Sequence, residues 1–281
     1  MDATPDEQDS IFRFKDNPTP KKMECFSIEK NSLDDPDLSY EMSRIGLCVI
    51  FNQKEFDKKL DLNSRDGTDI DCKYMEKIFR KMKYEVRVFL NATRSQYKEV
   101  FDSICQSEKS SYDCFFCIIM SHGEKGLIFS FDSPLSYEDI FNRFKGSNCP
   151  SLIGKPKACQ GSKFDVGTGK IVSDAKDEKV YYKLPMEADF YVVNSTYPGY
   201  YAWRTPANGS WLMQEVFKAL NNDYTSVRHN EINTIMTVVA RKVAFCYMSN
   251  TGSNQTNEMK QMVTRISTLT KLFYPYYIIN E

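Results

Sequence analysis

The sequence predicts an α/β fold in which a mostly parallel sheet carries helices on both faces. Two observations support this. Residues 45–51 and 114–120 are continuous apolar runs, which are typical of strands buried on both faces. Between them, residues 69–82 and 94–105 have helical character and are separated by a further strand-like run at 86–90. Repeated alternation of strand and helix favours a parallel sheet.

The remaining elements follow from shorter patterns. We expect a hairpin around residues 126–131, a helix at 137–144, a strand at 190–193, helices at 211–220 and 231–246, and a last strand within 262–273. Residues 1–40 are rich in Asp, Pro, Ser and Lys and indicate a mobile tail. Residues 166–179 are polar and aperiodic, which indicates a solvated linker.

Composition excludes several function classes. The 281 residues are 41% hydrophobic, enough for a substantial core, and 37 basic residues balance 38 acidic ones. Without a net field, binding to nucleic acid or an anionic membrane is not expected. The polar N-terminus carries no secretory signal and no apolar run reaches the ~20 residues of a membrane span, so we expect a cytoplasmic protein. Nine scattered cysteines suit reduced thiols.

Two histidines limit the possible bases. His229 lies in a polar segment before a helix, where a solvated surface residue is the expected interpretation. His122 directly follows the apolar run that ends at Met120, and ligands of open α/β sheets bind at the carboxyl ends of strands. The following Gly123 could expose a backbone N–H to an oxyanion. Alone, this pattern also fits a structural turn histidine.

Cys159 is the favoured nucleophile because it precedes Gly161 after a polar stretch, where exposure is expected. A thiol attacks carbonyls as thiolate and needs an imidazole to take and return the proton. The other cysteines are interpreted as small buried hydrophobes. Cys114 and Cys117 form a Cys-x-x-Cys without a second pair and would point to opposite faces of a strand, so neither a metal nor another cofactor is expected.

Four motifs in order resemble the caspase family: SRDGTD at residues 64–69, SHG at 121–123, ACQG at 158–161 and YYAWR at 200–204. The similarity extends from about residue 44 to the C-terminus. It implies a three-layer fold and a cysteine endopeptidase that cleaves after aspartate in programmed cell death. The short N-terminal tail resembles that of effector caspases. The implied division is a prodomain at 1–40, a large subunit at 41–174 and a small subunit at 175–281.

The resemblance also implies roles for individual residues. Cys159 would be the nucleophile, His122 the acid and base, and the N–H groups of Gly123 and Cys159 the oxyanion hole. Arg65 and Arg204 would hold the substrate aspartate, which is physically reasonable because a guanidinium offers paired donors to a carboxylate. Outside this motif, either arginine would be interpreted as a surface charge. The residues implied to line neighbouring subsites are Tyr201, Trp203 and Trp211.

The resemblance to effector caspases also implies a homodimer of protomers that an upstream caspase cuts in a linker after aspartate. In this chain, Asp174 is the best position for that zymogen cleavage, and Asp177 is second. The expected partners are therefore protein substrates with aspartate at the cleaved position, a second copy of the chain and an activating caspase.

The segment before Cys159 departs from the family pattern, in which an apolar strand ends in a glutamine that helps bind the substrate aspartate. Here 154–157 (GKPK) runs directly into Ala158, and His122 and Cys159 are 37 residues apart (159 − 122) against roughly 50 in caspases. About five residues, one strand of ~17 Å, are missing. Proline and two lysines should not replace a central strand. We expect either re-pairing through residues 151–153 or a chain without activity.

Three function classes follow. The first is an aspartate-directed cysteine endopeptidase. The second is a catalytically impaired caspase-like protein that binds or decoys active relatives. The third, a small-molecule hydrolase or redox protein that uses Cys114 and Cys117, has little support.

Overall fold

The structure, a computed structural model, describes residues 38–106, 112–124, 126–161, 186–197, 200–251 and 256–276. One compact unit spans Pro36–Glu281. The predicted linker and cleavage position Asp174 lie outside the described residues, as does almost all of the predicted prodomain.

A six-stranded sheet forms the centre of the unit, with the strand order β11-β8-β7-β3-β1-β2. All its pairs are parallel except the one between β11 and β8. Its strands are β1 (Leu47–Asn52), β2 (Glu85–Leu90), β3 (Phe115–Met120), β7 (Lys157–Gly161), β8 (Phe190–Asn194) and β11 (Thr264–Ser267). This confirms the predicted α/β class with a mostly parallel sheet.

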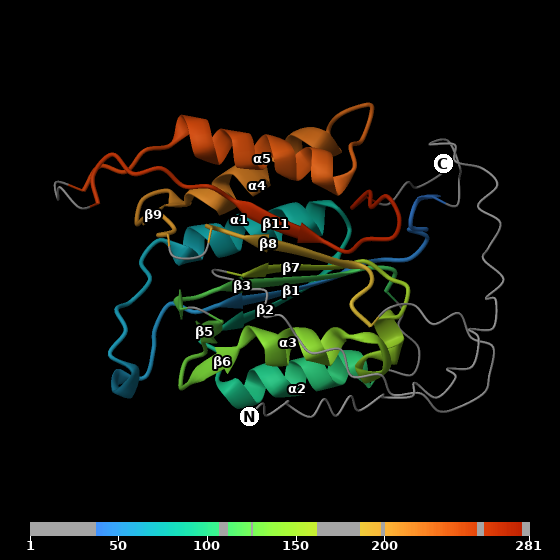
Figure 1. Cartoon of the computed structure of the whole chain (residues 1–281), viewed down its shortest axis with the longest axis horizontal. Helices are drawn as coiled ribbons and strands as arrows, with labels where there is room; N and C mark the ends of the chain where they lie inside the picture. Colours follow the sequence, from blue (N-terminus) through green and yellow to red (C-terminus); the bar gives the residue numbers. More distant parts are fainter. Residues whose placement is uncertain are drawn as a thin grey trace, which may run out of the picture. The chain divides into compact units, whose positions relative to one another are not determined.

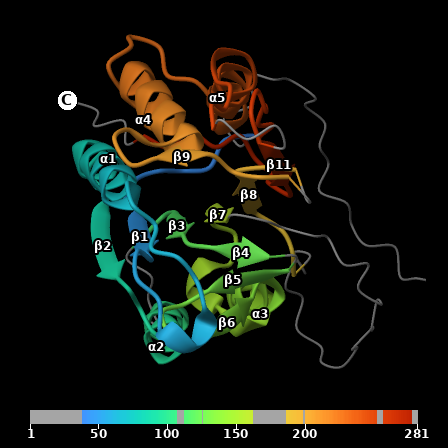
Figure 2. The same ribbon diagram turned by 90° about the vertical axis from the view of Figure 1, so that its left-hand side faces the viewer.

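Helices cover both faces of this sheet, as Figures 1 and 2 show. On one side lie α1 (Thr68–Lys81), α4 (Trp211–Tyr224) and α5 (Ile232–Cys246); on the other lie α2 (Arg94–Cys105) and α3 (Tyr137–Phe144). The alternating side chains of the strands divide into two cores, one toward each helical layer. Cys114 and Cys117 belong to different cores, as predicted.

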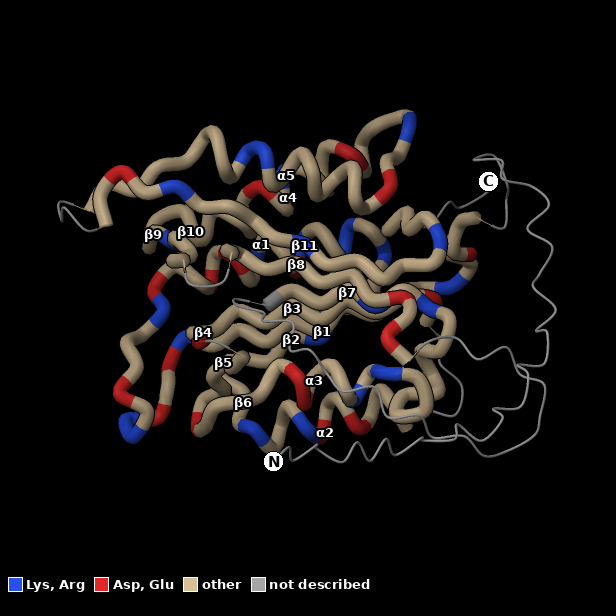
Figure 3. The backbone as a smooth tube through the Cα atoms, in the orientation of Figure 1, with Lys and Arg blue, Asp and Glu red and all other residues tan. Residues whose placement is uncertain are grey.

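Small elements connect the layers. Strands β4 (Gly123–Glu124), β5 (Leu127–Phe129) and β6 (Pro134–Ser136) form a three-stranded sheet, β9 (Arg204–Thr205) and β10 (Gly209–Ser210) form a hairpin, and 3-10 turns lie at Lys58–Leu60, Gly146–Asn148 and Pro150–Leu152. Basic and acidic residues are interspersed along the described backbone (Figure 3). Among the described residues, no helix has the length and apolar character that crossing a membrane requires.

The central strand β7 corrects the expectation about the shortened segment. The sheet does re-pair, but through Lys157–Gly161 and not through residues 151–153, the first two of which belong to the 3-10 turn Pro150–Leu152. Lys157 is only 3% exposed. It is tolerated because its Nζ donates to the carbonyls of Leu152 (3.3 Å) and Lys155 (2.9 Å) and lies 4.9 Å from the Phe190 ring centroid.

The predicted obstacle of Pro156 is avoided by its position. Pro156 lies immediately before β7, and its carbonyl accepts a hydrogen bond from the Phe115 N–H (3.0 Å). The N–H that proline lacks is therefore missing at the start of the strand, where proline is tolerated. A central strand can thus form here, although the proline and two lysines of the sequence predicted that it would not.

Candidate active site

His122 lies two residues beyond the carboxyl end of β3, where the sequence predicted a ligand site. Its Nε2 is 2.8 Å from the carbonyl oxygen of Asn63, and its ring lies 5.1 Å from that of Phe56. Because a carbonyl only accepts, Nε2 carries the proton and Nδ1 is the free base. Burial lowers the pKa of His122, and the charges of Arg65 and Arg204 lower it further. The lowered pKa favours the neutral ring, the form that accepts a proton from a thiol.

Arg65 is anchored beneath this histidine and is only 6% exposed. Its Nη1 donates to the carbonyls of Gln53 (2.7 Å) and Met120 (2.9 Å) and to the Thr68 hydroxyl (2.8 Å), so one edge of the guanidinium is fixed at the ends of β1 and β3. Among the ion pairs within 4 Å in the described chain, none includes Arg65. A buried cation without a bonded anion is costly, and its free edge is available to a ligand.

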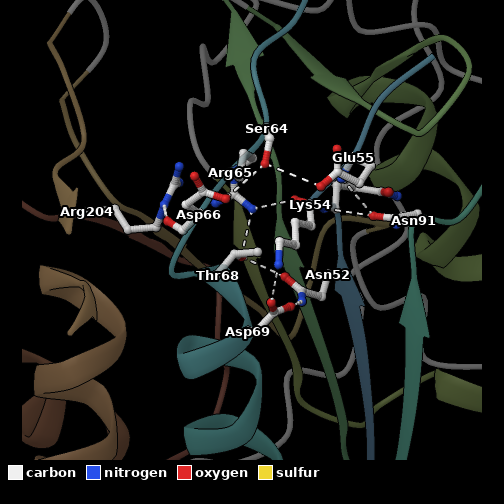
Figure 4. A network of polar contacts seen from close by, with 11 residues as sticks. Asn52, Lys54, Glu55, Ser64, Arg65, Asp66, Thr68, Asp69, Asn91 and Arg204 are labelled. Carbon is white, nitrogen blue, oxygen red and sulfur yellow. Dashed lines mark hydrogen bonds and ion pairs between the residues drawn. The ribbon is translucent and has the colours of Figure 1, made fainter. Parts of the chain in front are cut away.

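Arg204, in β9, approaches the same place from the C-terminal part of the chain (Figure 4). Its Nε donates to the Asp66 carbonyl (2.8 Å), and it too forms no ion pair within 4 Å in the described part of the chain. Burial, reinforced by the charge of Arg204, lowers the pKa of Arg65 to about 9. Two like charges held together in a partly buried place favour the binding of an anion between them.

A cavity of about 400 Å³ joins these groups. Its wall includes both arginines, His122 and Gly123, together with Tyr201 and Trp203 from the segment before β9. Trp211, at the start of α4, is not part of this wall: it is buried, its ring stacks 5.9 Å from that of Trp203, and the tilted ring of Tyr247 lies 5.2 Å away. Trp211 thus packs against Trp203 without lining the cavity.

Asp71, in the first turn of α1, is a member of this site that the sequence analysis missed. It lines the cavity, and its carboxylate accepts the Ser210 N–H at 2.8 and 3.1 Å. A Cβ at Gly209 would lie 2.2 Å from Asp71 Oδ1, so this approach requires glycine, which has φ +81°. Burial raises the pKa of Asp71 to about 6, against the lowering effect of the Ser210 hydrogen bonds and the two arginines. The carboxylate thus ties α1 to the hairpin that carries Arg204.

Cys159 does not lie with His122. It sits inside β7, level with Cys117 of β3, and is 7% exposed among the residues that face α2 and α3. Met120, at the end of β3, is three positions after Cys117, which is about 10 Å along the strand, and His122 lies beyond that end. The Cys159 N–H, predicted as an oxyanion donor, lies within a strand paired on both sides.

The comparisons identify the family. Residues 45–274 match the family model described as the caspase domain. Caspase-3 of Mesocricetus auratus is 37% identical over 248 residues, which cover 86% of this chain and 88% of that protein. Caspase-7 of Gallus gallus is 33% identical over 289 aligned residues, covering 98% and 93% of the two chains. The chain belongs to the caspase family.

A solved caspase structure agrees with this assignment. Caspase-1 from Spodoptera frugiperda superposes with a TM-score of 0.75 at 29% identity, covering 89% of this chain and 97% of that one. The fold and the family together make this chain a caspase-type cysteine endopeptidase, a class of protease that acts in cell death. The resemblance to the caspase family inferred from the four motifs is confirmed, and the caspase-3 and caspase-7 relatives are consistent with an effector-like caspase.

The caspase motifs thus converge only in part. Arg65, His122, Gly123, Tyr201, Trp203 and Arg204 share one cavity, although they come from segments up to 139 residues apart (204 − 65). Cys159 is separated from them by the register of β7. Besides Asp71, the sequence analysis missed Asn63, which fixes the tautomer of His122, and Gln160, which lines the cavity from β7. A signal for Asp71 was available, since it follows the Arg65 motif in the helix that the motif opens.

Proposed function

We propose that this caspase binds protein substrates through an aspartate side chain held by Arg65 and Arg204 and cleaves the following bond with Cys159 and His122. One observation carries the recognition part: two guanidinium groups without a bonded anion face one cavity beside a neutral imidazole. A substrate carboxylate would supply an anion bonded to both, since the Asp71 carboxylate in the same wall accepts the Ser210 N–H instead. An uncharged side chain would leave both cations unpaired and would be strongly disfavoured.

The chemistry follows from the groups present. The Cys159 thiol transfers its proton to His122 Nδ1, and the sulfur attacks the main-chain carbonyl carbon of the substrate aspartate; the oxyanion that forms accepts a hydrogen bond from the Gly123 N–H. His122 then returns the proton to the leaving amine, and water hydrolyses the thioester. In the described register the thiol is in the core, so catalysis requires β7 to advance by at least three residues.

The experiment measures recognition and turnover separately. A fluorogenic peptide with aspartate at the cleaved position reports turnover, and its non-cleavable analogue reports binding. Arg204→Ala should weaken binding about 100-fold because a charge-assisted pair is lost, whereas Arg228→Ala, on the α4–α5 connection, should not. Equal binding of aspartate and asparagine peptides to the unaltered protein would refute the recognition part.

A second candidate function is favoured by the burial of Cys159: a caspase-like protein that binds aspartate-containing peptides without cutting them. Cys159→Ala separates the two functions, and Cys117→Ala is its matched control, since both cysteines face the same core from adjacent strands. Loss of turnover only in Cys159→Ala would support the protease. Aspartate-selective binding with the same background signal in all three proteins would support the binding function.

Assembly and activation belong to the same proposal. We infer a cytoplasmic zymogen with a prodomain at 1–40, a large subunit at 41–174 and a small one at 175–281, cut after Asp174 by an upstream caspase. The homodimer is supported by β11, which forms one edge of the sheet, and by exposed apolar side chains near it, including Phe245, Met259 and Met262. Incubation with an active caspase should give fragments of 174 and 107 residues (281 − 174).

A further inference from the structure

Two cysteines from different parts of the chain meet at the C-terminal end of α2. Cys105 is the last residue of that helix, and Cys149 directly precedes the 3-10 turn Pro150–Leu152. Their side chains are joined by a hydrogen bond. The Ser151 hydroxyl donates to the carbonyl of Ile104 (2.9 Å), which holds the turn against the end of the helix. The two sulfurs therefore lie side by side, although they are 44 positions apart in the sequence (149 − 105).

This pair of thiols has a route to solvent. Cys105 is 9% exposed and lines a groove of about 780 Å³ between α2 and α3, whereas Cys149 is completely buried. The groove is far larger than a water molecule or a molecule of hydrogen peroxide. Cys105 also ends its helix, and helix ends open more readily than helix interiors. A small oxidant can thus reach the Cys105 sulfur without opening the core.

The surroundings of the pair favour a thiolate, which is the form of cysteine that peroxides oxidise. The hydrogen bond from Cys105 lowers the pKa of Cys149 to about 7, with help from the charge of Lys157 and against the effect of burial. The same hydrogen bond, together with burial, raises the pKa of Cys105. The two sulfurs thus share one proton and one negative charge near neutral pH, and that proton can lie on either of them.

We propose that Cys105 and Cys149 form an oxidisable dithiol, which a hydroperoxide converts to a disulfide between α2 and the segment that leads into β7. With the shared proton on Cys149, the Cys105 thiolate attacks one oxygen of hydrogen peroxide. The O–O bond breaks, hydroxide leaves, and Cys105 becomes a sulfenic acid. The Cys149 sulfur then attacks the Cys105 sulfur, and the displaced hydroxide takes the Cys149 proton to form water. Two electrons pass from the sulfurs to the peroxide, which ends as one water and one hydroxide.

The disulfide has a structural consequence beyond the two cysteines. Cys149 lies eight positions before Lys157, the first residue of β7 (157 − 149). A covalent bond from Cys149 to α2 therefore fixes the start of the chain that enters this strand. The backbone amides of residues 150–156 should then exchange their hydrogens more slowly, because exchange requires local opening.

The test uses the full chain, first reduced with dithiothreitol, then freed of it and exposed to a small molar excess of hydrogen peroxide. Remaining thiols are blocked with N-ethylmaleimide in denaturant, and unreduced digests are analysed by mass spectrometry. The variants are Cys105→Ser, Cys149→Ser and Cys72→Ser. Cys72, in α1, is the matched control because it is similarly buried (6% exposed) but faces the other core. Thermal unfolding establishes that each variant is folded, and alanine replaces serine in a variant that is not.

We expect a linked Cys105–Cys149 peptide in the unaltered chain and in Cys72→Ser, at least about tenfold more abundant than any other linked pair within one chain, and its loss on addition of dithiothreitol. Amide exchange of residues 150–156 should slow at least about tenfold on oxidation of the unaltered chain and stay unchanged in Cys105→Ser. Oxidation of other thiols while these two remain unlinked, or over-oxidation of Cys105 without a disulfide, would overturn the proposal. A disulfide that leaves amide exchange unchanged would refute the tether to the segment before β7. None of these outcomes depends on turnover or peptide binding, so they are independent of the proposed function.

Discussion

Cys159 lies directly opposite Cys117 in the parallel register of β7 and β3, and both thiols face the core beneath α2 and α3. A hydrogen bond to Cys159, together with burial, raises the pKa of the Cys117 thiol well above its ordinary value. A nucleophilic cysteine needs the opposite environment, an exposed and electropositive one. The register of one strand therefore decides whether the caspase machinery of this chain is complete.

This register predicts the order in which the thiols react. Cys246, at the end of α5, is exposed, whereas Cys159 and Cys117 are buried. Iodoacetamide should therefore modify Cys246 first. Cys159 should react no faster than Cys117, and both should react at least about 10²-fold more slowly than Cys246, since a buried thiol reacts only when the core opens. Mass spectrometry of timed digests measures the three rates. Modification of Cys159 as fast as that of Cys246 would mean that β7 is not held in this register in solution.

Restoring the missing length should restore the catalytic pair. Five apolar residues inserted between Lys157 and Ala158 add about 17 Å of strand and carry Cys159 past the end of β3 toward His122. Turnover of the fluorogenic aspartate peptide should rise about 10²-fold or more, the scale of general acid–base assistance. The same insertion with Cys159→Ala is the control. An inserted chain that folds and binds the peptide but gains no turnover would contradict this account.

Much of this arrangement could be predicted from the sequence because it depends on local patterns. Apolar runs located β1 and β3, helical periodicity located α1, and the strand end before His122 located the site. The register of β7 could not be predicted in this way. It depends on whether Lys157 can be buried. The two carbonyls and the Phe190 ring that contact its ammonium group come together only in the folded chain.

Asp71 should make stability depend on pH in an unusual direction. Its pKa is raised to about 6 in the folded protein, chiefly by burial, whereas in the unfolded chain it is about 3.9. The folded state thus binds this proton more tightly, so the contribution is present below pH 4 and is lost as pH rises to about 6. Asp71→Asn removes it. The free energy of unfolding of the unaltered protein, relative to that of Asp71→Asn, should fall by about 2–3 kcal/mol across this window.

Urea titrations of both proteins between pH 4 and 7 measure this difference. The contribution of His122 has the opposite sign, because burial lowers its pKa and protonation therefore opposes folding. It is present in both proteins, so its contribution cancels in the comparison to the extent that the two sites act independently. A difference that does not change with pH would show that the Asp71 carboxylate is not buried as the structure has it.

The last prediction concerns dimer formation through β11, which is an edge strand of the central sheet. Met262, two residues before β11, is 56% exposed, and Leu90, at the end of β2 on the opposite edge of the sheet, is 66% exposed. The two positions are thus matched in exposure and differ in the edge at which they lie. If two copies pair through β11, Met262→Glu places a charge in the interface and should raise the dimer dissociation constant at least tenfold, since a desolvated unpaired carboxylate is costly. Leu90→Glu should leave it unchanged. Sedimentation velocity over a concentration series measures both constants, and an equal effect of the two substitutions would place the interface elsewhere.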